Sequence, residues 1–263
     1  MYEANPDAAA LAEIGEWLAQ AERVVFFTGA GISTDSGIPD FRGPNGLWTK
    51  NPLAEKTSTL SWYLRDPEVR KLAWESRARN FDRQMQPNDG HRAIVDVHGM
   101  GRLSSVITQN VDGLHQAAGI PDGMVIEVHG TGRFGRCWDC GDRRPMDEYV
   151  GRVIAGDPDP HCEICGGVVK SDAILFEQSL VPEVINRAFE EAAACDLLVA
   201  VGSTLQVSPA NGVVPEARAN GARVVIVNGE PTVMDGHAHK VVVGSITPAL
   251  QAIVGAARTH DRD

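Results

Sequence analysis

The stretch FTGAGISTDSGIPDFRG, residues 27–43, starts at the end of an apolar run and continues as a glycine-rich turn. Its glycines fall at Gly29, Gly31 and Gly37. Thr34 therefore occupies the third glycine position of the pattern G-x-G-x-x-G, in which glycines let the backbone approach a dinucleotide. The stretch consequently fits an ordinary dehydrogenase loop poorly.

Outward from this loop, short β-branched runs alternate with helical stretches. A helix is expected over residues 10–22, where apolar residues recur on one face, and another over 182–194, which begins with proline. The runs expected to be strands are RVVFFTG (23–29), SSVITQN (104–110), MVIEVHG (124–130), AILF (173–176), DLLVAVGS (196–203), ARVVIVNG (222–229) and KVVVG (240–244). These runs lack apolar-polar alternation, as strands buried on both faces do. The pattern predicts an α/β fold with a doubly wound, parallel, Rossmann-like sheet.

Two segments interrupt this alternation. Residues 44–91 are rich in tryptophan, arginine and polar helix formers without a strand signal, and residues 132–171 contain four of the five cysteines. We expect them to form a smaller helical and zinc-ribbon domain inserted into the large one. The large, discontinuous Rossmann-like domain would then comprise residues 1–43, 92–131 and 172–263, with the ligand cleft between the two domains.

The four cysteines of the second segment form two C-x2-C pairs. Cys137 and Cys140 are separated from Cys162 and Cys165 by 21 residues, which is the spacing of a zinc ribbon. Disulfides are the weaker alternative because nothing in the sequence indicates secretion. A catalytic zinc is also the weaker reading, since four thiolates leave no position for water. We therefore expect one structural zinc per chain, and expect Cys195 to be a small buried apolar residue.

Composition limits the partners. The chain has 263 residues, 43% of them apolar, and a formal net charge of -11. Clustered basic residues are needed to neutralise a phosphate backbone, so we expect no direct nucleic-acid binding. No run is long enough to cross a membrane and the first residues do not resemble a secretory signal, so the cytoplasm is the expected compartment. The acidity favours basic polypeptide partners or simply serves solubility.

Polar residues follow several of the expected strands. These groups are Thr108–Gln109–Asn110–Val111–Asp112, His129–Gly130, Gly202–Ser203–Thr204 and Asn228–Gly229–Glu230. Because parallel strands end at the same edge of a sheet, we expect these loops to converge with the glycine-rich turn. Taken singly, a histidine at a strand end is more often structural, and Asn-x-Asp is more often a turn.

Together these motifs resemble those of the sirtuins, the NAD-dependent protein-lysine deacylases, and in particular the bacterial members. The resemblance rests on GAGIS (29–33), SGIPDFRG (36–43), TQNVD (108–112), GLH (113–115), HG (129–130) and the four cysteines, in that order. It runs from about residue 10 to residue 250. The glycine-rich turn accordingly resembles the sirtuin NAD loop, and NAD is the implied co-substrate.

The resemblance implies a mechanism and assigns roles. In sirtuins the acyl-lysine carbonyl attacks C1′ of the nicotinamide ribose, nicotinamide leaves, and a base then activates a ribose hydroxyl. His129 matches that base, while Asn110 and Asp112 match the residues that hold the nicotinamide and ribose end. Phe41 would cover the reacting carbon. The residues implied to contact NAD are Gly29, Ala30, Gly31, Ser33, Thr34, Phe41, Arg42, Gln109, Asn110, Val111, Asp112, Gly202, Ser203, Thr204, Asn228, Gly229 and Glu230.

The substrate side departs from the common sirtuin pattern. Where many members read F-G-E, this chain has Phe176-Glu177-Gln178, and Ala173, Ile174 and Phe176 would line an apolar acyl-lysine tunnel with Val111. Plain core packing is the alternative for these apolar residues. The substrate would add as a strand between this segment and the one after Gly202.

The helix that precedes Gly90-His91 bears on the acyl group. Sirtuins that remove succinyl or malonyl groups carry a tyrosine and an arginine three residues apart on this helix, which here lacks tyrosine from Trp74 onward. Arg77 and Arg79 are present, and we expect them to lie on a solvated face. Neutral acyl groups should therefore be preferred.

We accordingly expect an NAD-dependent protein deacetylase acting on acetylated-lysine proteins. Two alternatives use the same motifs: a mono-ADP-ribosyltransferase, which would leave ADP-ribose on protein, and a non-catalytic adaptor that retains the NAD and zinc sites. The presence of Asn110, Asp112 and His129 favours the enzyme.

Overall fold

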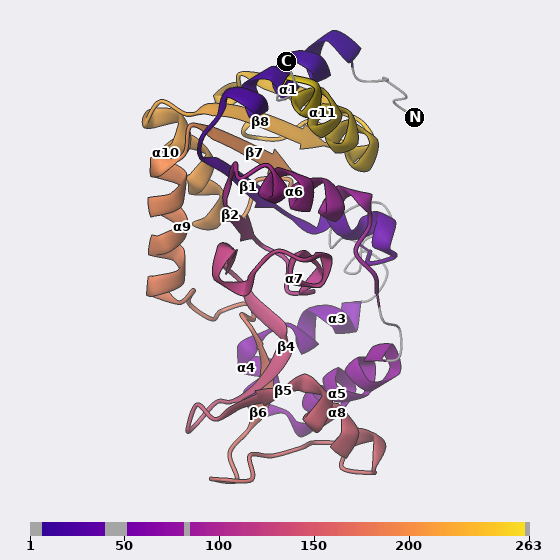
Figure 1. Ribbon diagram of the computed structural model, residues 1–263. Coiled ribbons are helices and arrows are strands. Elements are labelled where there is room, and N and C mark those ends of the chain that lie inside the picture. The colour runs from indigo at the N-terminus through magenta and orange to yellow at the C-terminus, as the bar shows by residue number, and fades with distance from the viewer. Residues whose placement is uncertain (1–6, 40–51, 82–84, 261–263) are drawn as a thin grey trace.

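The computed structural model describes residues 7–39, 52–81 and 85–260 (Figure 1). Its larger part is a six-stranded parallel sheet in the order β3-β2-β1-β7-β8-β9. The strands are β1 (Val24–Thr28), β2 (Leu103–Thr108), β3 (Val125–Glu127), β7 (Leu197–Val201), β8 (Arg223–Asn228) and β9 (Lys240–Val243). This order is that of a Rossmann-like sheet. The predicted doubly wound α/β fold is confirmed.

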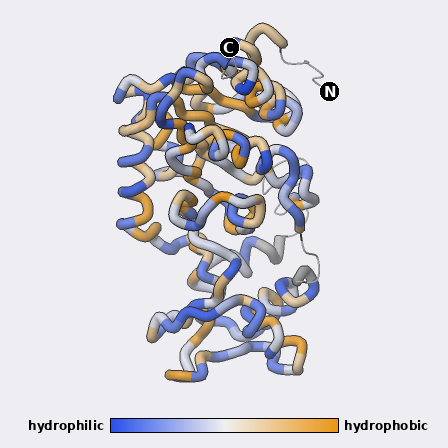
Figure 2. Tube along the Cα trace, in the orientation of Figure 1, coloured by the Kyte–Doolittle hydropathy of each residue, from blue (hydrophilic) through white to orange (hydrophobic). Residues whose placement is uncertain are grey.

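Helices cover both faces of this sheet. On one side lie α1 (Ala8–Gln20), α6 (Asp89–Gly99) and α11 (Ile246–His260), and on the other α9 (Pro182–Ala194) and α10 (Val213–Ala219) (Figure 1). The strand β1 shows why two covers are needed: Val24 and Phe26 belong to the first core, Val25 and Phe27 to the second, and all are buried. Hydrophobic residues accordingly gather inside this larger body (Figure 2). No described helix is both long and apolar enough to cross a membrane.

A smaller module carries its own sheet. Its antiparallel strands, in the order β5-β4-β6, are β4 (Gly130–Cys137), β5 (Arg143–Pro145) and β6 (Val169–Ala173). Four helices belong with it: α3 (Pro52–Thr57), α4 (Leu60–Arg65), α5 (Pro67–Phe81) and α8 (Met146–Ile154). The short elements α7 (Leu114–Ala118), η1 (Ala30–Ser36), η2 (Asp122–Met124), η3 (Ala210–Gly212) and η4 (Asp235–His237) complete the described fold. The helix α6 runs through the boundary proposed at 91/92, and the domain boundaries stay a prediction.

One strand prediction is wrong. The run AILF (173–176) was expected to join the large parallel sheet, but β6 ends at Ala173 and pairs antiparallel with β4. Beyond it, the Phe176 N–H donates to the Ser58 carbonyl (2.8 Å) and the Phe176 carbonyl accepts from the Leu60 N–H (3.1 Å). Leu175 is buried against the helices of the small module. The apolar run therefore belongs to a second, smaller core.

Candidate active site

The loops after β1 and β7 meet where the strand order of the large sheet reverses. The Gly29 N–H donates to the Val201 carbonyl (2.9 Å) and the Gly31 N–H to the Gly202 carbonyl (2.8 Å). A Cβ on Gly29 would lie 2.7 Å from the Gly202 oxygen, and one on Gly31 would lie 2.8 Å from the Gly202 Cα. The glycines of the opening stretch therefore allow two loops to touch at the point where α/β sheets bind ligands.

A hydrogen-bonded group fills the space behind this contact. The Ser33 hydroxyl donates to Asp112 Oδ2 (2.8 Å) and accepts from Asn110 Nδ2 (3.3 Å), which also donates to the Gly29 carbonyl (3.1 Å). The other Asp112 oxygen accepts from the Leu114 N–H (2.9 Å). Ser33 is 1% exposed and Asn110 is 7% exposed. Three of the predicted NAD-site residues thus fix one another and the turn of the glycine loop.

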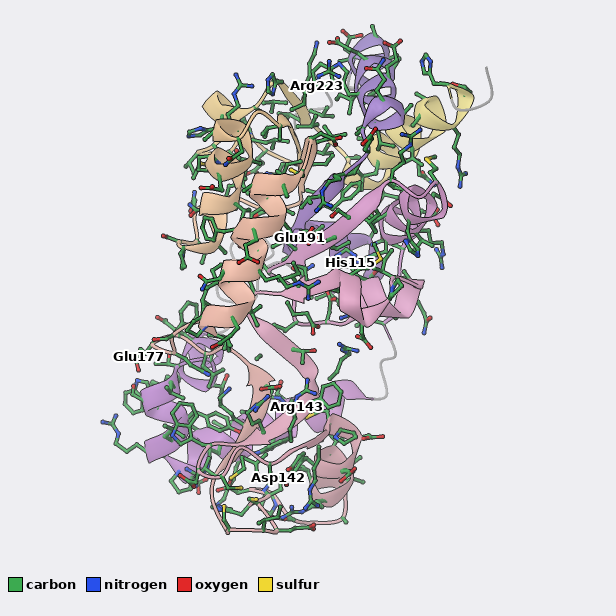
Figure 3. The ribbon with its side chains drawn as sticks, turned by 60° about the vertical axis from the view of Figure 1, so that its left-hand side comes forward. His115, Asp142, Arg143, Glu177, Glu191 and Arg223 are labelled. Carbon is green, nitrogen blue, oxygen red and sulfur yellow. The ribbon has the colours of Figure 1, made fainter. Side chains whose placement is uncertain are left out.

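Two buried histidines lie next to this group. Asn88 N–H donates to His91 Nδ1 (3.4 Å), so the proton of neutral His91 sits on Nε2, which lies 3.5 Å from Ser33 Oγ. The His115 side chain (Figure 3) lies with its Nε2 2.9 Å from Thr28 Oγ1. Its ring is 5.1 Å from that of His91. Both rings are neutral because a protonated, charged imidazole at these buried positions would lose its hydration by water.

Burial dominates the pKa values of these rings. It lowers the pKa of His91 to about 4, an effect that Asp112 opposes and Arg92 reinforces. Burial lowers the pKa of His115 to about 3, and the neighbouring His91 adds to the shift. The pair is therefore uncharged throughout the neutral range.

The imidazole ring of His129 is held by a hydrogen bond to a backbone carbonyl. Its Nδ1 lies 3.2 Å from the Gln109 carbonyl, which can only accept, so Nδ1 carries the proton and Nε2 is a free base. Burial lowers the pKa of His129, and the hydrogen bond to Gln109 opposes that shift. The carbonyl of His129 accepts from the Ile174 N–H (2.8 Å), which joins this residue to the predicted substrate segment.

The remaining predicted NAD contacts lie along the same edge. Gln109 Nε2 donates to the Ser203 hydroxyl (2.8 Å), and the Val111 carbonyl accepts from the Gly132 N–H (2.7 Å). The Thr34 hydroxyl donates a hydrogen bond to the Gly31 carbonyl (2.9 Å). Partly or fully exposed along this edge are Ala30, Thr204, Asn228, Gly229 and Glu230. Phe41 and Arg42 lie outside the described residues.

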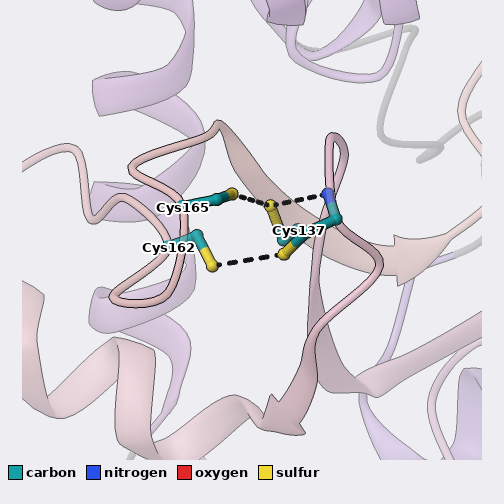
Figure 4. A group of neighbouring side chains, drawn as sticks. Cys137, Cys162 and Cys165 are labelled. Atoms are coloured by element: carbon teal, nitrogen blue, oxygen red, sulfur yellow. Dashed lines mark hydrogen bonds between the residues drawn. The ribbon is translucent and has the colours of Figure 1, made fainter.

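The four cysteines of the small module come together (Figure 4). Their sulfur atoms lie within 4.8 Å of one another, with Cys137 Sγ 3.5 Å from Cys165 Sγ and Cys140 Sγ 3.6 Å from Cys162 Sγ. A tetrahedral zinc with Zn–S bonds of about 2.3 Å requires sulfur separations of about 3.8 Å. The geometry therefore fits zinc, and none of the five cysteines forms a disulfide. Cys195 is buried beneath the large sheet, as expected.

The predicted substrate segment is partly open. Phe176 is 44% exposed, while Ala173 and Ile174 are half-buried. Glu177, in the glycine position of related sequences, has a backbone φ of 70°, in the left-handed region that favours glycine. Its carboxylate accepts from the Ser61 N–H (3.1 Å) in the first turn of α4, where backbone donors lack helical partners (Figure 3). Glu177 thus joins the segment after β6 to the first turn of α4.

The two arginines of α5 differ. Arg79 pairs with Glu75 on an exposed face, as expected. The expectation for Arg77 is wrong: its Nη2 donates to the Ser171 hydroxyl (2.8 Å), and its guanidinium lies over the Trp74 ring. A planar cation can stack on an aromatic ring while hydrogen bonding at its edge. Arg77 therefore joins α5 to β6.

Sequence reasoning gave no role to Asn88, His91, His115, Thr28 or Thr108. A series of hydrogen bonds runs from His115 through the Thr28 hydroxyl to the Thr108 hydroxyl. The Thr108 hydroxyl in turn accepts from the Asn110 N–H (3.1 Å). A usable signal was the placement of Gly90-His91 and Gly113-Leu114-His115 within motif stretches. Their roles depend on contacts between residues 58 to 87 positions apart.

Residues 29–209 match the Sir2 family, and the chain therefore belongs to that family. Among its relatives is NAD-dependent protein deacetylase 2 of Streptomyces coelicolor, 47% identical over 230 residues that cover 86% of this chain and 95% of the relative. NAD-dependent protein deacetylase 1 of Bradyrhizobium diazoefficiens is 40% identical over 244 residues, covering 92% and 94% respectively.

Solved Sir2 structures share the fold. One, determined in work on the mechanism and regulation of Sir2 enzymes, is 36% identical with a TM-score of 0.84 over 97% of this chain and all of that one. Sir2Af2 bound to a myristoylated histone peptide is 32% identical with a TM-score of 0.78, over 98% and 100% of the two chains. A Sir2 homologue in complex with NAD is 28% identical with a TM-score of 0.83, over 94% of each chain.

Proposed function

We propose that this protein is an NAD-dependent protein deacetylase that transfers the acyl group of an acetylated lysine to ADP-ribose and releases nicotinamide. The observation that carries the proposal is the state of His129 in a Sir2-family chain. Its Nδ1–H is tied to the Gln109 carbonyl, so its unprotonated Nε2 is available to take a proton. The lowered pKa keeps this nitrogen unprotonated at neutral pH.

Each neighbouring group has a task in this proposal. Asn110 and Asp112, held by Ser33, would orient the nicotinamide ribose, while the loops at Gly29 and Gly202 would contact the diphosphate and adenosine parts. NAD supplies the electrophilic ribose carbon when bound. Ile174 and Phe176 would bind the acyl-lysine side chain, next to the residue that carries the base. We also propose that substrates are acetylated-lysine proteins and that the enzyme works in the cytoplasm.

Mass spectrometry tests the function directly. The zinc-loaded protein is incubated with NAD and an acetyl-lysine peptide, and nicotinamide, deacetylated peptide and O-acetyl-ADP-ribose are quantified together. Equal amounts of the three products are expected. In a parallel reaction with NAD labelled in its ADP-ribose part, nicotinamide release with the label attached to protein would instead identify a mono-ADP-ribosyltransferase. The absence of all three products from folded, zinc-loaded protein would contradict the proposal.

A further inference from the structure

One face of the small sheet carries a row of three positive charges. Arg136 of β4 lies opposite Arg143 of β5 and opposite Lys170 of β6. Side chains that are directly opposite in an antiparallel sheet project to the same face, with Cβ atoms about 5 Å apart. Like charges at such positions destabilise a sheet, so this row calls for a negative partner.

The chain provides one carboxylate on this face. Arg136 Nε donates to Asp172 Oδ1 (2.6 Å), and Arg143 Nε donates to Asp172 Oδ2 (2.6 Å). Lys170 is 2% exposed, and its Nζ donates to the Ser171 and Ala173 carbonyls (2.9 and 2.7 Å). Three cations therefore share one carboxylate on the described part of this face. Burial lowers the pKa of Lys170 to about 8, which still leaves most of it protonated at neutral pH.

A cavity of about 710 Å³ lies against this charged face. Its other walls come from β3, from the start of α9 and from the turn that contains Cys137, Trp138 and Gly141. The apolar side chains Val125, Val181 and Val184 belong to the first two of these walls. This volume is within the range of small-molecule sites, which combine apolar walls with a few polar groups.

Two further carboxylates line the cavity, and each has a cation close by. Glu127 pairs with Arg133 (3.2 Å). Glu183 stands one helical turn before Arg187 on α9, at the spacing where opposite charges attract. The lining thus holds four cationic side chains, Arg136, Arg143, Lys170 and Arg187, and three carboxylates, Asp172, Glu127 and Glu183.

We propose that this cavity is a second ligand site, which takes a small organic carboxylate: the carboxylate binds the guanidinium groups of Arg136 and Arg143, beside the buried Lys170, and an apolar body packs against β3 and α9. The guanidinium groups suit this ligand because a planar fork of N–H donors matches a carboxylate, and Arg143 uses only its Nε on Asp172. Of the residues predicted to bind NAD or substrate, only Ile174 lines the cavity. The cavity also reaches Val128 and Gly130, on either side of His129, but it includes none of the residues predicted to contact NAD.

Three probes with one apolar body and different charges test this site. Phenylbutyrate, phenylbutanol and phenylbutylamine are titrated into the full-length, zinc-loaded, 15N-labelled protein and followed by NMR. Phenylbutyrate should shift the amide signals of β6 and the start of α9 and bind about tenfold more tightly than the alcohol, because charged hydrogen bonds add to apolar contact. The amine should not shift them.

Arg143→Gln should weaken phenylbutyrate binding about tenfold and leave phenylbutanol binding unchanged. Arg144→Gln is the matched control, because Arg144 is the next residue of β5 and its side chain instead bonds Asp142 and Glu163. Figure 3 shows Asp142 and Arg143 in the small module. Should Arg143→Gln not fold, Arg136→Gln, at the opposite position of β4, replaces it with the same expected loss of phenylbutyrate binding.

Equal affinity for the acid and the alcohol would overturn the proposal. So would unchanged phenylbutyrate binding by a folded Arg143→Gln protein, or phenylbutyrate shifts confined to the loops at Gly29 and Ser203. The last outcome would mean that the anion occupies the predicted NAD edge.

Discussion

At the scale of single residues, His129 is the side chain on which the proposed chemistry depends. Replacing it with alanine removes a base without opening the apolar core, since the ring contacts a backbone carbonyl. We expect His129→Ala to lower deacetylation by about 100-fold or more, the usual contribution of a general base, while the melting temperature stays close to that of the parent. His98→Ala, on α6, is the control. Normal turnover, or an unfolded variant, would contradict the assignment.

The pH profile of the same reaction gives an independent check. The pKa of His129 is lowered from 6.5, so the free-base form predominates above that value and is lost only as the pH falls through the lowered pKa. We therefore expect the acid limb of kcat/KM to lie below pH 6.5. A limb centred above pH 6.5 that also disappears in His129→Ala would show that the imidazole is more basic than its burial implies.

The acyl preference is a second residue-scale prediction. Arg77 is tied to Ser171 and to the Ala73 carbonyl, and Arg79 is paired with Glu75, so neither guanidinium is free to receive an acyl carboxylate. An unpartnered buried carboxylate costs several kcal/mol, which corresponds to roughly a hundredfold or more in relative efficiency. We expect an acetyl peptide to be turned over faster than its succinyl twin by that factor. Faster turnover of the succinyl peptide would refute this, and Arg77 and Arg79 would then be mutated.

At the scale of elements, we expect the small sheet to depend on metal binding. β4 leads directly into Cys137, and Cys162 and Cys165 lie shortly before β6, so the thiolates tie together the ends of strands that have little apolar core. Metal binding contributes about 10 kcal/mol to the folding of zinc-finger peptides. We expect about one zinc per chain, and expect chelation or Cys137→Ala to unfold this module, as measured by protease susceptibility within residues 130–173. Cys195→Ala should retain the metal.

Full activity of folded, metal-free protein would contradict that expectation. Such a result would mean that apolar packing, and not metal binding, stabilises the module. That packing forms two small cores, one around Trp74 and Tyr149 and one around Tyr63.

The elements also show how far the sequence could predict the structure. Six strand runs and the two expected helices were recognisable because burial on both faces or on one helical face leaves a local pattern. AILF was misplaced because an apolar run does not say which of two cores it enters. The grouping of the four cysteines was predictable from their spacing alone, whereas β5 is three residues long and shows no local signal. The buried hydrogen bonds through His115 and Thr28 could be found only from the structure, since they join residues far apart in sequence.

At the scale of the whole molecule, the buried histidines couple folding to pH. In the unfolded chain their pKa values are near 6.5, and in the folded protein they are about 4 for His91 and about 3 for His115. The unfolded state therefore binds more protons below pH 6.5, and the free energy of unfolding falls as the pH drops through this range. The stability that the neutral rings provide is complete above pH 6.5 and is lost as the pH falls toward 4.

We expect each imidazole to remove roughly 2 kcal/mol of stability between pH 6.5 and pH 4.5. Denaturant unfolding of the parent and of His91→Asn and His115→Asn at these two pH values measures it, because carboxylates common to all three proteins cancel in the difference. Each variant should lose less stability on acidification than the parent does. His98→Asn, with its ring outside the buried pair, should retain the parent slope. If all four proteins lost the same stability between pH 6.5 and pH 4.5, the two imidazoles would not be held neutral by folding. The protonation states in the hydrogen-bonded group around Ser33 would then have to be reassigned.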